Sequence, residues 1–215
     1  PTQNFNTKMG YLARIHPDNP QTKQLESIAK LLNDGGVAII PTDTVYALAC
    51  SSASVKGLEK MSKIKGNDVK NKFSFLFYDL SQLSTYTKQF DTATYKLLKR
   101  SLPGPYTFIM DASNELSKVY KNKKKTIGIR VPNNNITRQL TELVGHPLAV
   151  TSFHIDDDIL EYSTNAELIF EDMENIVDVV IDGGVGTLTP STIIDLTSGT
   201  PEVVREGLGS LDVLG

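Results

Sequence analysis

The sequence predicts an α/β protein (α+β in some schemes) built as one domain around a mixed sheet. Amphipathic helical segments alternate with short apolar strands at first, and short strands follow one another towards the end. The chain has 215 residues, enough for one large domain or two small ones at roughly 100–200 residues each. No repeat, low-complexity tract or linker divides it. We therefore expect a short extended segment over 1–20 and a single domain over 21–215.

The first elements are predicted by apolar periodicity and by stop signals. A helix should run from Gln21 to the Gly35-Gly36 pair, because four apolar residues recur at helical spacing. These four are Leu25, Ile28, Ala29 and Leu32. Residues 37–40 then form a buried strand that Pro41 breaks. Ser54 is the expected N-cap of a second helix.

The middle of the chain continues the alternation. The aromatic-rich segment 73–78 is strand-like. Asp91 should cap a helix that reaches about Leu102, before a Pro-Gly-Pro break. Strands are predicted over 106–110 and 126–131, joined by a lysine-rich hairpin connection.

The last elements complete the mixed sheet. Apolar spacing over 136–144 predicts a helix, and 147–152 reads as a buried strand. Thr164-Asn165-Ala166-Glu167 matches a capping box, so a helix should run over about 165–175. Short strands are predicted at the end of the chain, over 177–181, 192–196 and 202–205.

The composition is that of an ordinary globular protein. Hydrophobic residues make up 40% and charged residues 22%, which excludes disordered and collagen-like chains. The net charge of −3 argues against a dedicated basic nucleic-acid clamp but is compatible with a local basic face. Cys50 is the single cysteine, which fits a reducing compartment. With no membrane-length apolar run and no signal-peptide core, we expect a soluble, cytoplasmic protein.

Several common kinds of site have no motif in this chain. The P-loop, the Rossmann fingerprint and the nucleophile elbow are all missing. The histidines His16, His146 and His154 are scattered, and no zinc-like Cys/His cluster forms. Cys50 is better explained as a small buried hydrophobe than as a nucleophile.

Seven polar or Gly/Pro-rich segments remain, most of them just beyond predicted strands, where ligands collect in open α/β sheets. They cover 41–46, 63–66, 102–107, 128–132, 150–154, 189–195 and 203–207. Each has a plain structural explanation: Thr and Asp side chains can satisfy a turn, and Lys63 and Lys65 can complement a helix C-terminus. Alternatively, the lysine pair binds phosphate groups. The accumulation of seven such segments favours a ligand site.

Two basic features each leave two explanations open. Arg130 lies in an otherwise apolar strand, so it either faces solvent or is buried beside an anion, for which a ligand phosphate or carboxylate would serve. The basic stretch that ends at Arg130 contains Lys121, Lys123, Lys124 and Lys125. It is either a solvated loop or a contact for nucleic-acid phosphates.

Taken in order, these segments resemble the YrdC/Sua5 family from about Gln21 to Gly207. The matching pieces are PTDTVYAL (41–48), KIKG (63–66), LPGPYTFIM (102–110), TIGIRVP (126–132), VTS (150–152), PSTIIDL (190–196) and VVREG (203–207). The sequence segments 79–86 and 125–132 look most like the YciO branch of the family. The resemblance implies a twisted, mostly parallel-core mixed sheet of parallel and antiparallel strands, with flanking helices and a large concave basic cavity.

The resemblance also implies an activity. Members of the Sua5/YrdC branch make L-threonylcarbamoyl-adenylate from L-threonine, bicarbonate and ATP and release pyrophosphate, a nucleotidyltransferase reaction that serves the t6A37 modification of tRNA. Mg²⁺ would accompany the ATP phosphates without protein ligands of its own. The alternative implied by the family is a double-stranded RNA- or ribosome-binding module, a translation factor without synthase activity. The four lysines of the basic stretch would then contact RNA.

Site roles follow from the resemblance, residue by residue. The catalytic group would be Lys63, Lys65 and Thr44. The threonine and carbamoyl end would be lined by Thr42, Tyr46, Arg130 and Ser152. The nucleotide would contact Thr107, Ser191, Arg205 and His154.

The chain departs from the family pattern at several of these positions. Lys65 stands where the family has arginine, which replaces a two-pronged donor with a point charge. Ser152-Phe153-His154 replaces Ser-Ala-Asn, and residues 67–72 replace a proline-rich segment. A histidine common in the strand that follows is absent; Phe77 or Tyr78 stands near that position. The resemblance therefore implies a retained pocket with reduced catalysis or an altered substrate.

Overall fold

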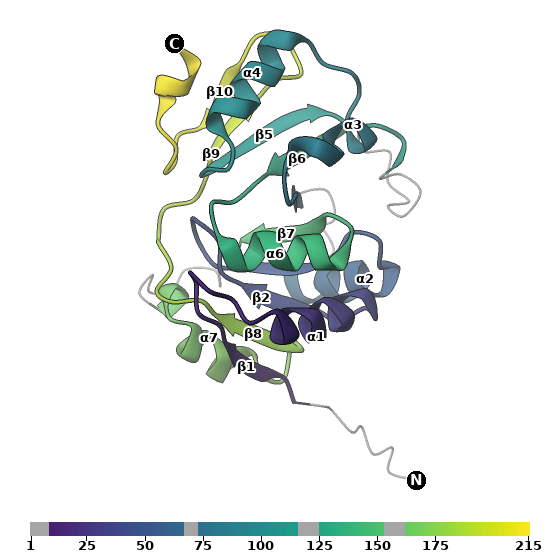
Figure 1. Ribbon diagram of the computed structural model, residues 1–215, viewed down its shortest axis with the longest axis vertical. Coiled ribbons are helices and arrows are strands. Elements are labelled where there is room, and N and C mark those ends of the chain that lie inside the picture. The colour runs from purple at the N-terminus through teal and green to yellow at the C-terminus, as the bar shows by residue number, and fades with distance from the viewer. Residues whose placement is uncertain (1–8, 67–72, 116–124, 153–161) are drawn as a thin grey trace.

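The computed structural model describes residues 9–66, 73–115, 125–152 and 162–215 (Figure 1). In these residues ten strands form one sheet in the order β1-β8-β2-β3-β7-β4-β6-β5-β9-β10. The strands are β1 (Tyr11–Arg14), β2 (Ala38–Ile40), β3 (Ala47–Ser51), β4 (Ser74–Leu76), β5 (Tyr106–Asp111), β6 (Thr126–Arg130), β7 (Leu148–Ser152), β8 (Val179–Asp182), β9 (Thr192–Asp195) and β10 (Glu202–Arg205).

The sheet is mixed, as predicted. Parallel pairs are β1–β8, β2–β8, β4–β6 and β5–β9. The other neighbours are antiparallel, including the central pairs β2–β3, β3–β7 and β7–β4 and the expected hairpin pair β5–β6. The expected mostly parallel core is therefore wrong, because the three central pairs of the sheet are antiparallel.

Several helices begin at residues whose side chains cap the first turn. The described α-helices are α1 (Thr22–Asn33), α2 (Val55–Lys65), α3 (Leu83–Tyr86), α4 (Thr92–Ser101), α6 (Asn135–Val144) and α7 (Ala166–Met173). Ser54 accepts a hydrogen bond from the Gly57 N–H, and Asp91 accepts one from the Thr94 N–H, so both predicted caps are confirmed. Short 3₁₀ turns are η2 (Leu80–Gln82), η3 (Tyr162–Thr164) and η4 (Leu211–Leu214). None of the described helices has the length and apolar character needed to cross a membrane.

The helices cover the two faces of the sheet unequally. One buried apolar cluster joins α1 and α6 to alternate residues of β2, β3, β7 and β8, and Leu76 of β4 belongs to it. The opposite face packs against α2, α4 and α7. The α1/α6 cluster contains no described residue of β6, β5, β9 or β10. In Figure 1, α1 and α6 lie over the lower half of the sheet, and those four strands form much of the upper half.

The structure adds two strands to the predicted elements and places one helix cap at a different residue. β3 was not predicted, because Ala47–Ser51 is rich in small residues with weak strand propensity and directly follows what looks like a turn. β1 falls inside the 1–20 segment and pairs with β8, so this part of the segment belongs to the sheet. The cap of α7 is Asn165 rather than Thr164: the Asn165 Oδ1 accepts hydrogen bonds from the Glu167 and Leu168 N–H groups, while Thr164 lies in η3.

Candidate functional site

A buried ion pair joins the loop after β2 to the end of β6. The Arg130 Nη2 lies 3.2 Å from the Asp43 Oδ1 and donates a 2.8 Å hydrogen bond to the Thr44 Oγ1. The side chains of Arg130 and Asp43 are only 8% and 10% exposed, so this pair has little access to solvent. The Asp43 Oδ2 also accepts a hydrogen bond from the Asn133 N–H. Of the two explanations for Arg130, burial beside an anion is correct, and Asp43 supplies that anion.

The Arg130 guanidinium keeps one unsatisfied donor. Its Nε is buried and finds no hydrogen-bond partner among the described residues. Burial lowers the pKa of Arg130 from its usual value, the charge of Arg205 lowers it further, and Asp43 opposes both effects. Because an orphaned buried donor is costly, an additional anionic acceptor at this position would be stabilising.

The threonine hydroxyls beside Arg130 are held in a local network. The Thr42 Oγ1 donates to the Val45 carbonyl and accepts from the Thr44 N–H, and it lies 3.1 Å from the Thr44 Oγ1. On the other side, the Thr137 Oγ1 of α6 donates to the Pro41 carbonyl. The network fixes the loop against α6 and holds the Thr44 hydroxyl towards Arg130.

Tyr46 closes the same loop against the turn after β8. Its hydroxyl donates to the Gly184 carbonyl at 2.6 Å and accepts from the Gly183 N–H at 3.3 Å. Burial raises the pKa of Tyr46 to about 12. A Cβ at Gly186 would lie 2.9 Å from the Tyr46 ring, so the glycine is needed for this close approach. The phenol thus fixes the relative position of two loops.

A second polar cluster lies on β5, on β10 and at the residue just before β9. The Thr107 and Ser191 hydroxyls are both buried and share a 2.7 Å hydrogen bond. The Arg205 Nε and Nη2 both donate to the Ser191 carbonyl, at 3.1 and 2.8 Å. Burial lowers the pKa of Arg205. This arrangement fixes a second guanidinium beside two hydroxyl groups.

The strand register brings the two clusters onto one face. In the β4–β6 register Arg130 pairs with Leu76, and Leu76 belongs to the α1/α6 cluster. In the β5–β6 register Phe108 pairs with Ile129. The neighbouring residues Thr107 and Arg130 therefore share the other face of the sheet, because side chains alternate along a strand. Ile193 pairs with Thr107 on one side and with Arg205 on the other, so Arg205 lies on the same face as Thr107. We call this face of β6, β5, β9 and β10, with Arg130, Thr107, Ser191 and Arg205, the polar half.

The other expected site residues lie at the ends of elements. Lys63 and Lys65 occupy the last turn of α2, which packs against β3. Ser152 is exposed at the end of β7, opposite Ala47. Lys125 is exposed immediately before β6, whereas His154, Lys121, Lys123 and Lys124 lie outside the described residues. The large concave basic cavity stays a prediction.

Asp43 is the site residue that the sequence reasoning missed. The signal was present as an aspartate in a polar loop and an arginine in an apolar strand. A separation of 87 residues and the absence of a periodic relation hid the pair. Burial of Arg130 was the missing information, because a buried guanidinium needs a counter-ion.

Residues 30–207 match the family Sua5/YciO/YrdC, whose description is telomere recombination. The chain belongs to this family. It is 38% identical to YciO of Escherichia coli K12, an uncharacterized protein, over 92% of this chain and 95% of that one. The crystal structure of E. coli YciO superposes with a TM-score of 0.85 over 96% of this chain and 100% of that chain. The expected likeness to the YciO branch is confirmed.

More distant relatives carry a named activity. The threonylcarbamoyl-AMP synthase of Mus musculus is 30% identical over 86% of this chain and 68% of that protein. Pyrococcus abyssi Sua5, solved in complex with L-threonine, superposes with a TM-score of 0.80 at 26% identity. That match covers 91% of this chain but only 57% of the Sua5 chain.

Proposed function

We propose that this protein is a cytoplasmic threonylcarbamoyl-AMP synthase of the YciO type, with L-threonine, bicarbonate and ATP as substrates. The observation that carries the proposal is the polar half, where Arg130 and Arg205 are fixed on one sheet face with buried hydroxyl groups between them. Fixed cations and hydroxyl donors suit a reaction whose substrates are anions. The name of a relative at 30% identity, the threonylcarbamoyl-AMP synthase of Mus musculus, supports this reaction class.

The proposed chemistry asks the protein mainly to position charges. The threonine amine captures CO₂ as an N-carboxylate. An oxygen of this carboxylate attacks the ATP α-phosphorus in line, forming one P–O bond, while the bond to the leaving pyrophosphate breaks. Mg²⁺ would arrive with the ATP phosphates as part of the substrate. The product would serve the t6A modification of tRNA.

Each group of residues has a role in this proposal. Arg130, with its unsatisfied Nε, and Thr44 would bind the carboxylate end, beside Thr42 and Ser152. Tyr46 would hold that loop in place. Thr107, Ser191, Arg205 and His154 would contact the nucleotide, and Lys63 and Lys65 would neutralise the phosphates. Lys65 supplies a point charge at the position where the family has the two-pronged guanidinium of an arginine. We therefore expect a lower rate of pyrophosphate release.

The test is pyrophosphate release by the purified protein with ATP, bicarbonate and L-threonine, each omitted in turn. The proposal predicts release only when all three are present. Lys63→Ala should abolish release, whereas Lys56→Ala, on the first turn of the same helix, should leave it unchanged. Release that does not depend on threonine, or full activity in Lys63→Ala, would contradict the proposal.

The alternative function is RNA binding. Of its four lysines the structure describes Lys125, which is exposed at the start of β6. This alternative predicts affinity for double-stranded RNA that falls steeply as salt rises. The RNA-binding alternative is supported if pyrophosphate release is absent and a filter-binding assay shows such affinity. It fails if no RNA is retained at low salt.

A further inference from the structure

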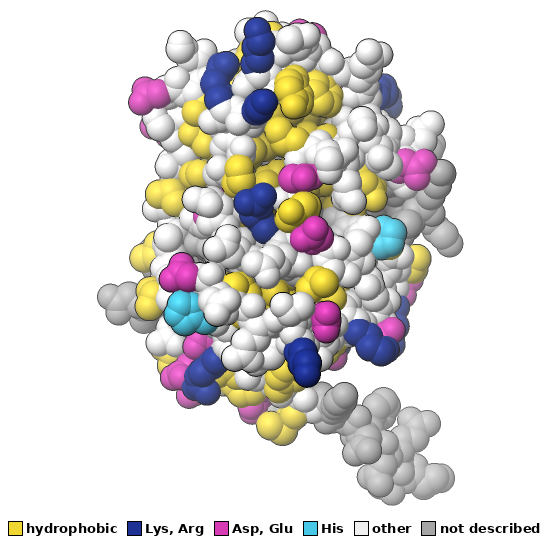
Figure 2. Space-filling view, viewed as in Figure 1, with side chains coloured by type: hydrophobic (Ala, Val, Ile, Leu, Met, Phe, Trp, Pro, Cys, Tyr) yellow, Lys and Arg dark blue, Asp and Glu magenta, His cyan; other side chains and the backbone are white. Residues whose placement is uncertain are grey.

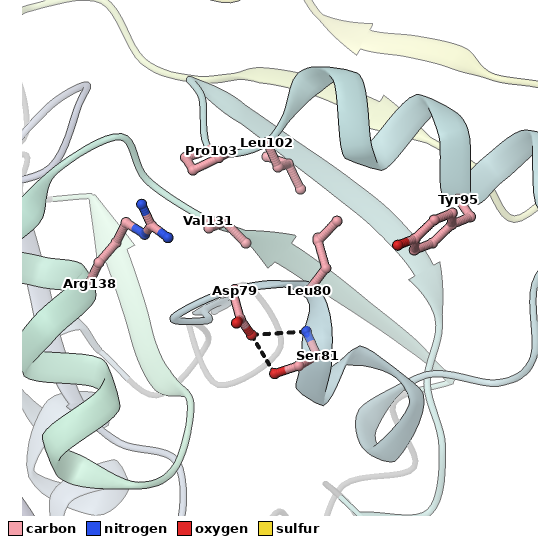
Figure 3. Close-up of a pocket in the computed structure, with 8 residues that line it drawn as sticks. All are labelled: Asp79, Leu80, Ser81, Tyr95, Leu102, Pro103, Val131 and Arg138. Carbon is pink, nitrogen blue, oxygen red and sulfur yellow. Dashed lines mark hydrogen bonds between the residues drawn. The ribbon is translucent and has the colours of Figure 1, made fainter.

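A hollow of about 480 Å³ lies between α4, α6 and the turn that follows β4. Figure 3 shows Arg138 on one side and Tyr95 on the other, with apolar side chains between them. The apolar lining is Leu80, Leu102, Pro103 and Val131. Figure 2, viewed as Figure 1, shows basic, acidic and hydrophobic side chains close together near the centre of that face of the molecule. None of these lining residues belongs to the polar half.

Arg138 is a fixed cation at the edge of the hollow. Its Nε donates a 3.0 Å hydrogen bond to the Tyr78 carbonyl, and its guanidinium lies 5.5 Å from the centre of the Tyr78 ring. Both contacts restrict the side chain. Its Nη nitrogens have no hydrogen-bond partner among the described residues, so they are available to an anion.

Asp79 is a fixed anion at the same hollow. One carboxylate oxygen accepts hydrogen bonds from the Ser81 N–H and the Ser81 hydroxyl, at 2.9 and 2.5 Å. Within the described part of the chain, no ion pair joins Asp79 to Arg138. The hollow thus presents two opposite charges that do not neutralise each other, next to an apolar surface.

We propose that this hollow binds a free amino acid with a large apolar or aromatic side chain. The carboxylate would pair with Arg138, the ammonium group would pair with Asp79, and the side chain would cover Leu102 and Val131. A simple organic anion would leave Asp79 facing its negative charge, and a simple amine would face Arg138. Charge complementarity therefore selects a zwitterion.

The hollow shares its backbone with the candidate site. Val131 directly follows Arg130, and the Val131 carbonyl accepts a 3.0 Å hydrogen bond from the Gly104 N–H. The same segment continues from Leu102 and Pro103 into β5, which carries Thr107. A ligand in the hollow would therefore contact the segment that follows Arg130 and the segment that leads into Thr107. This inference stands independently of the synthase reaction.

The test is an NMR titration of the full chain with L-phenylalanine in the absence of ATP. For a ligand of this size the expected Kd is on the order of 1 mM. Two matched probes each lack one charge: 3-phenylpropionate has no ammonium group, and phenethylamine has no carboxylate. Each should bind at least about tenfold more weakly, the loss expected for one charged hydrogen bond. Equal binding of either probe overturns the zwitterion assignment.

Variants locate the site. Arg138→Gln and Asp79→Asn should each weaken L-phenylalanine binding about tenfold or more. Arg100→Gln is the matched control, because its Nε likewise donates to a carbonyl, that of Val213, away from the hollow. Binding that survives Arg138→Gln but is lost in Arg205→Gln would assign the amino acid to the polar half and overturn the proposal. No binding at about 20 mM, far above the expected Kd, would also overturn it.

Discussion

One face of the sheet has two halves that differ in what covers them. Over β8, β2, β3 and β7, the side chains on this face are apolar and buried by α1 and α6. Over β6, β5, β9 and β10, the same face carries Arg130, Thr107 and Arg205, and the α1/α6 cluster ends at Leu76. The covered half stabilises the fold by burial of apolar area. The polar half instead holds charges in fixed positions.

The boundary between the halves is set by the Asp43–Arg130 pair. Arg130 lies next to the apolar cluster and is almost fully removed from water, which costs free energy unless a partner compensates. Asp43 and the Thr44 hydroxyl provide most of that compensation, and the orphaned Nε shows that it is incomplete. The fixed charges therefore lie where the sheet extends beyond α1 and α6, and this is where we propose that the substrates bind.

The largest effect is expected from breaking this boundary. Asp43→Ala removes the counter-ion of a buried guanidinium and the acceptor of the Asn133 N–H. We expect a loss of about 3–5 kcal/mol in the free energy of unfolding, measured by urea denaturation. Asp34→Ala is the control, since Asp34 pairs with Lys30 in solvent and should cost less than about 1 kcal/mol. Similar losses in both variants would contradict a special role for Asp43.

The covered half should respond to cavity formation. Leu140 is fully buried on α6, so Leu140→Ala should lower the free energy of unfolding by about 2–5 kcal/mol. Leu143 lies on the same helix but is 39% exposed, and Leu143→Ala should cost much less. Urea denaturation measures both. Equal effects would mean that α6 does not bury Leu140 against the sheet as described.

Ionisation of Tyr46 should make the free energy of unfolding fall as pH rises in the alkaline range. Its pKa is raised by burial to about 12 in the folded state, against 10.0 for an ordinary tyrosine. The unfolded chain therefore loses its proton first, so this contribution to stability is complete below pH 10 and declines as pH rises towards 12. Tyr46→Phe should remove this decline, roughly 2–3 kcal/mol at 1.36 kcal/mol per pKa unit. Tyr95→Phe, at an exposed position, should leave it unchanged.

The smallest effect concerns a hydrogen bond within the polar half. Thr107→Val removes the hydroxyl that pairs with Ser191 while nearly keeping its shape. The free energy of unfolding should fall by about 1 kcal/mol, because the Ser191 hydroxyl keeps a longer contact with Arg205. Thermal unfolding of the two proteins in parallel measures this difference. A loss as large as that of Asp43→Ala would show that the two clusters are equally important for folding.

Local signals in the sequence predicted most elements. Apolar spacing identified α1, and Ser54 and Asp91 identified the starts of α2 and α4, because capping depends on residues only a few positions apart. β3 escaped prediction because Ala and Ser carry little strand preference, and its position between β2 and β7 is decided by tertiary packing.

The sequence indicated which residues of the polar half are polar, but the partner of Arg130 could not be predicted from it. Arg130 was recognised as either solvated or buried beside an anion, and the strand pattern alone does not distinguish these cases. Asp43 comes from a loop 87 residues away, and the hollow lined by Asp79 and Arg138 joins three separate segments. Such groupings depend on strand order and register, which are long-range properties of the fold.

The most direct test of the polar half is the rate of pyrophosphate release in two matched arginine variants. The assay contains ATP, bicarbonate and L-threonine. Arg205→Gln removes a guanidinium of the polar half, while Arg100→Gln removes one that donates to the Val213 carbonyl, outside the polar half. We predict at least a tenfold loss for Arg205→Gln and little change for Arg100→Gln. Equal rates in both variants would contradict the assignment of the polar half as the substrate site.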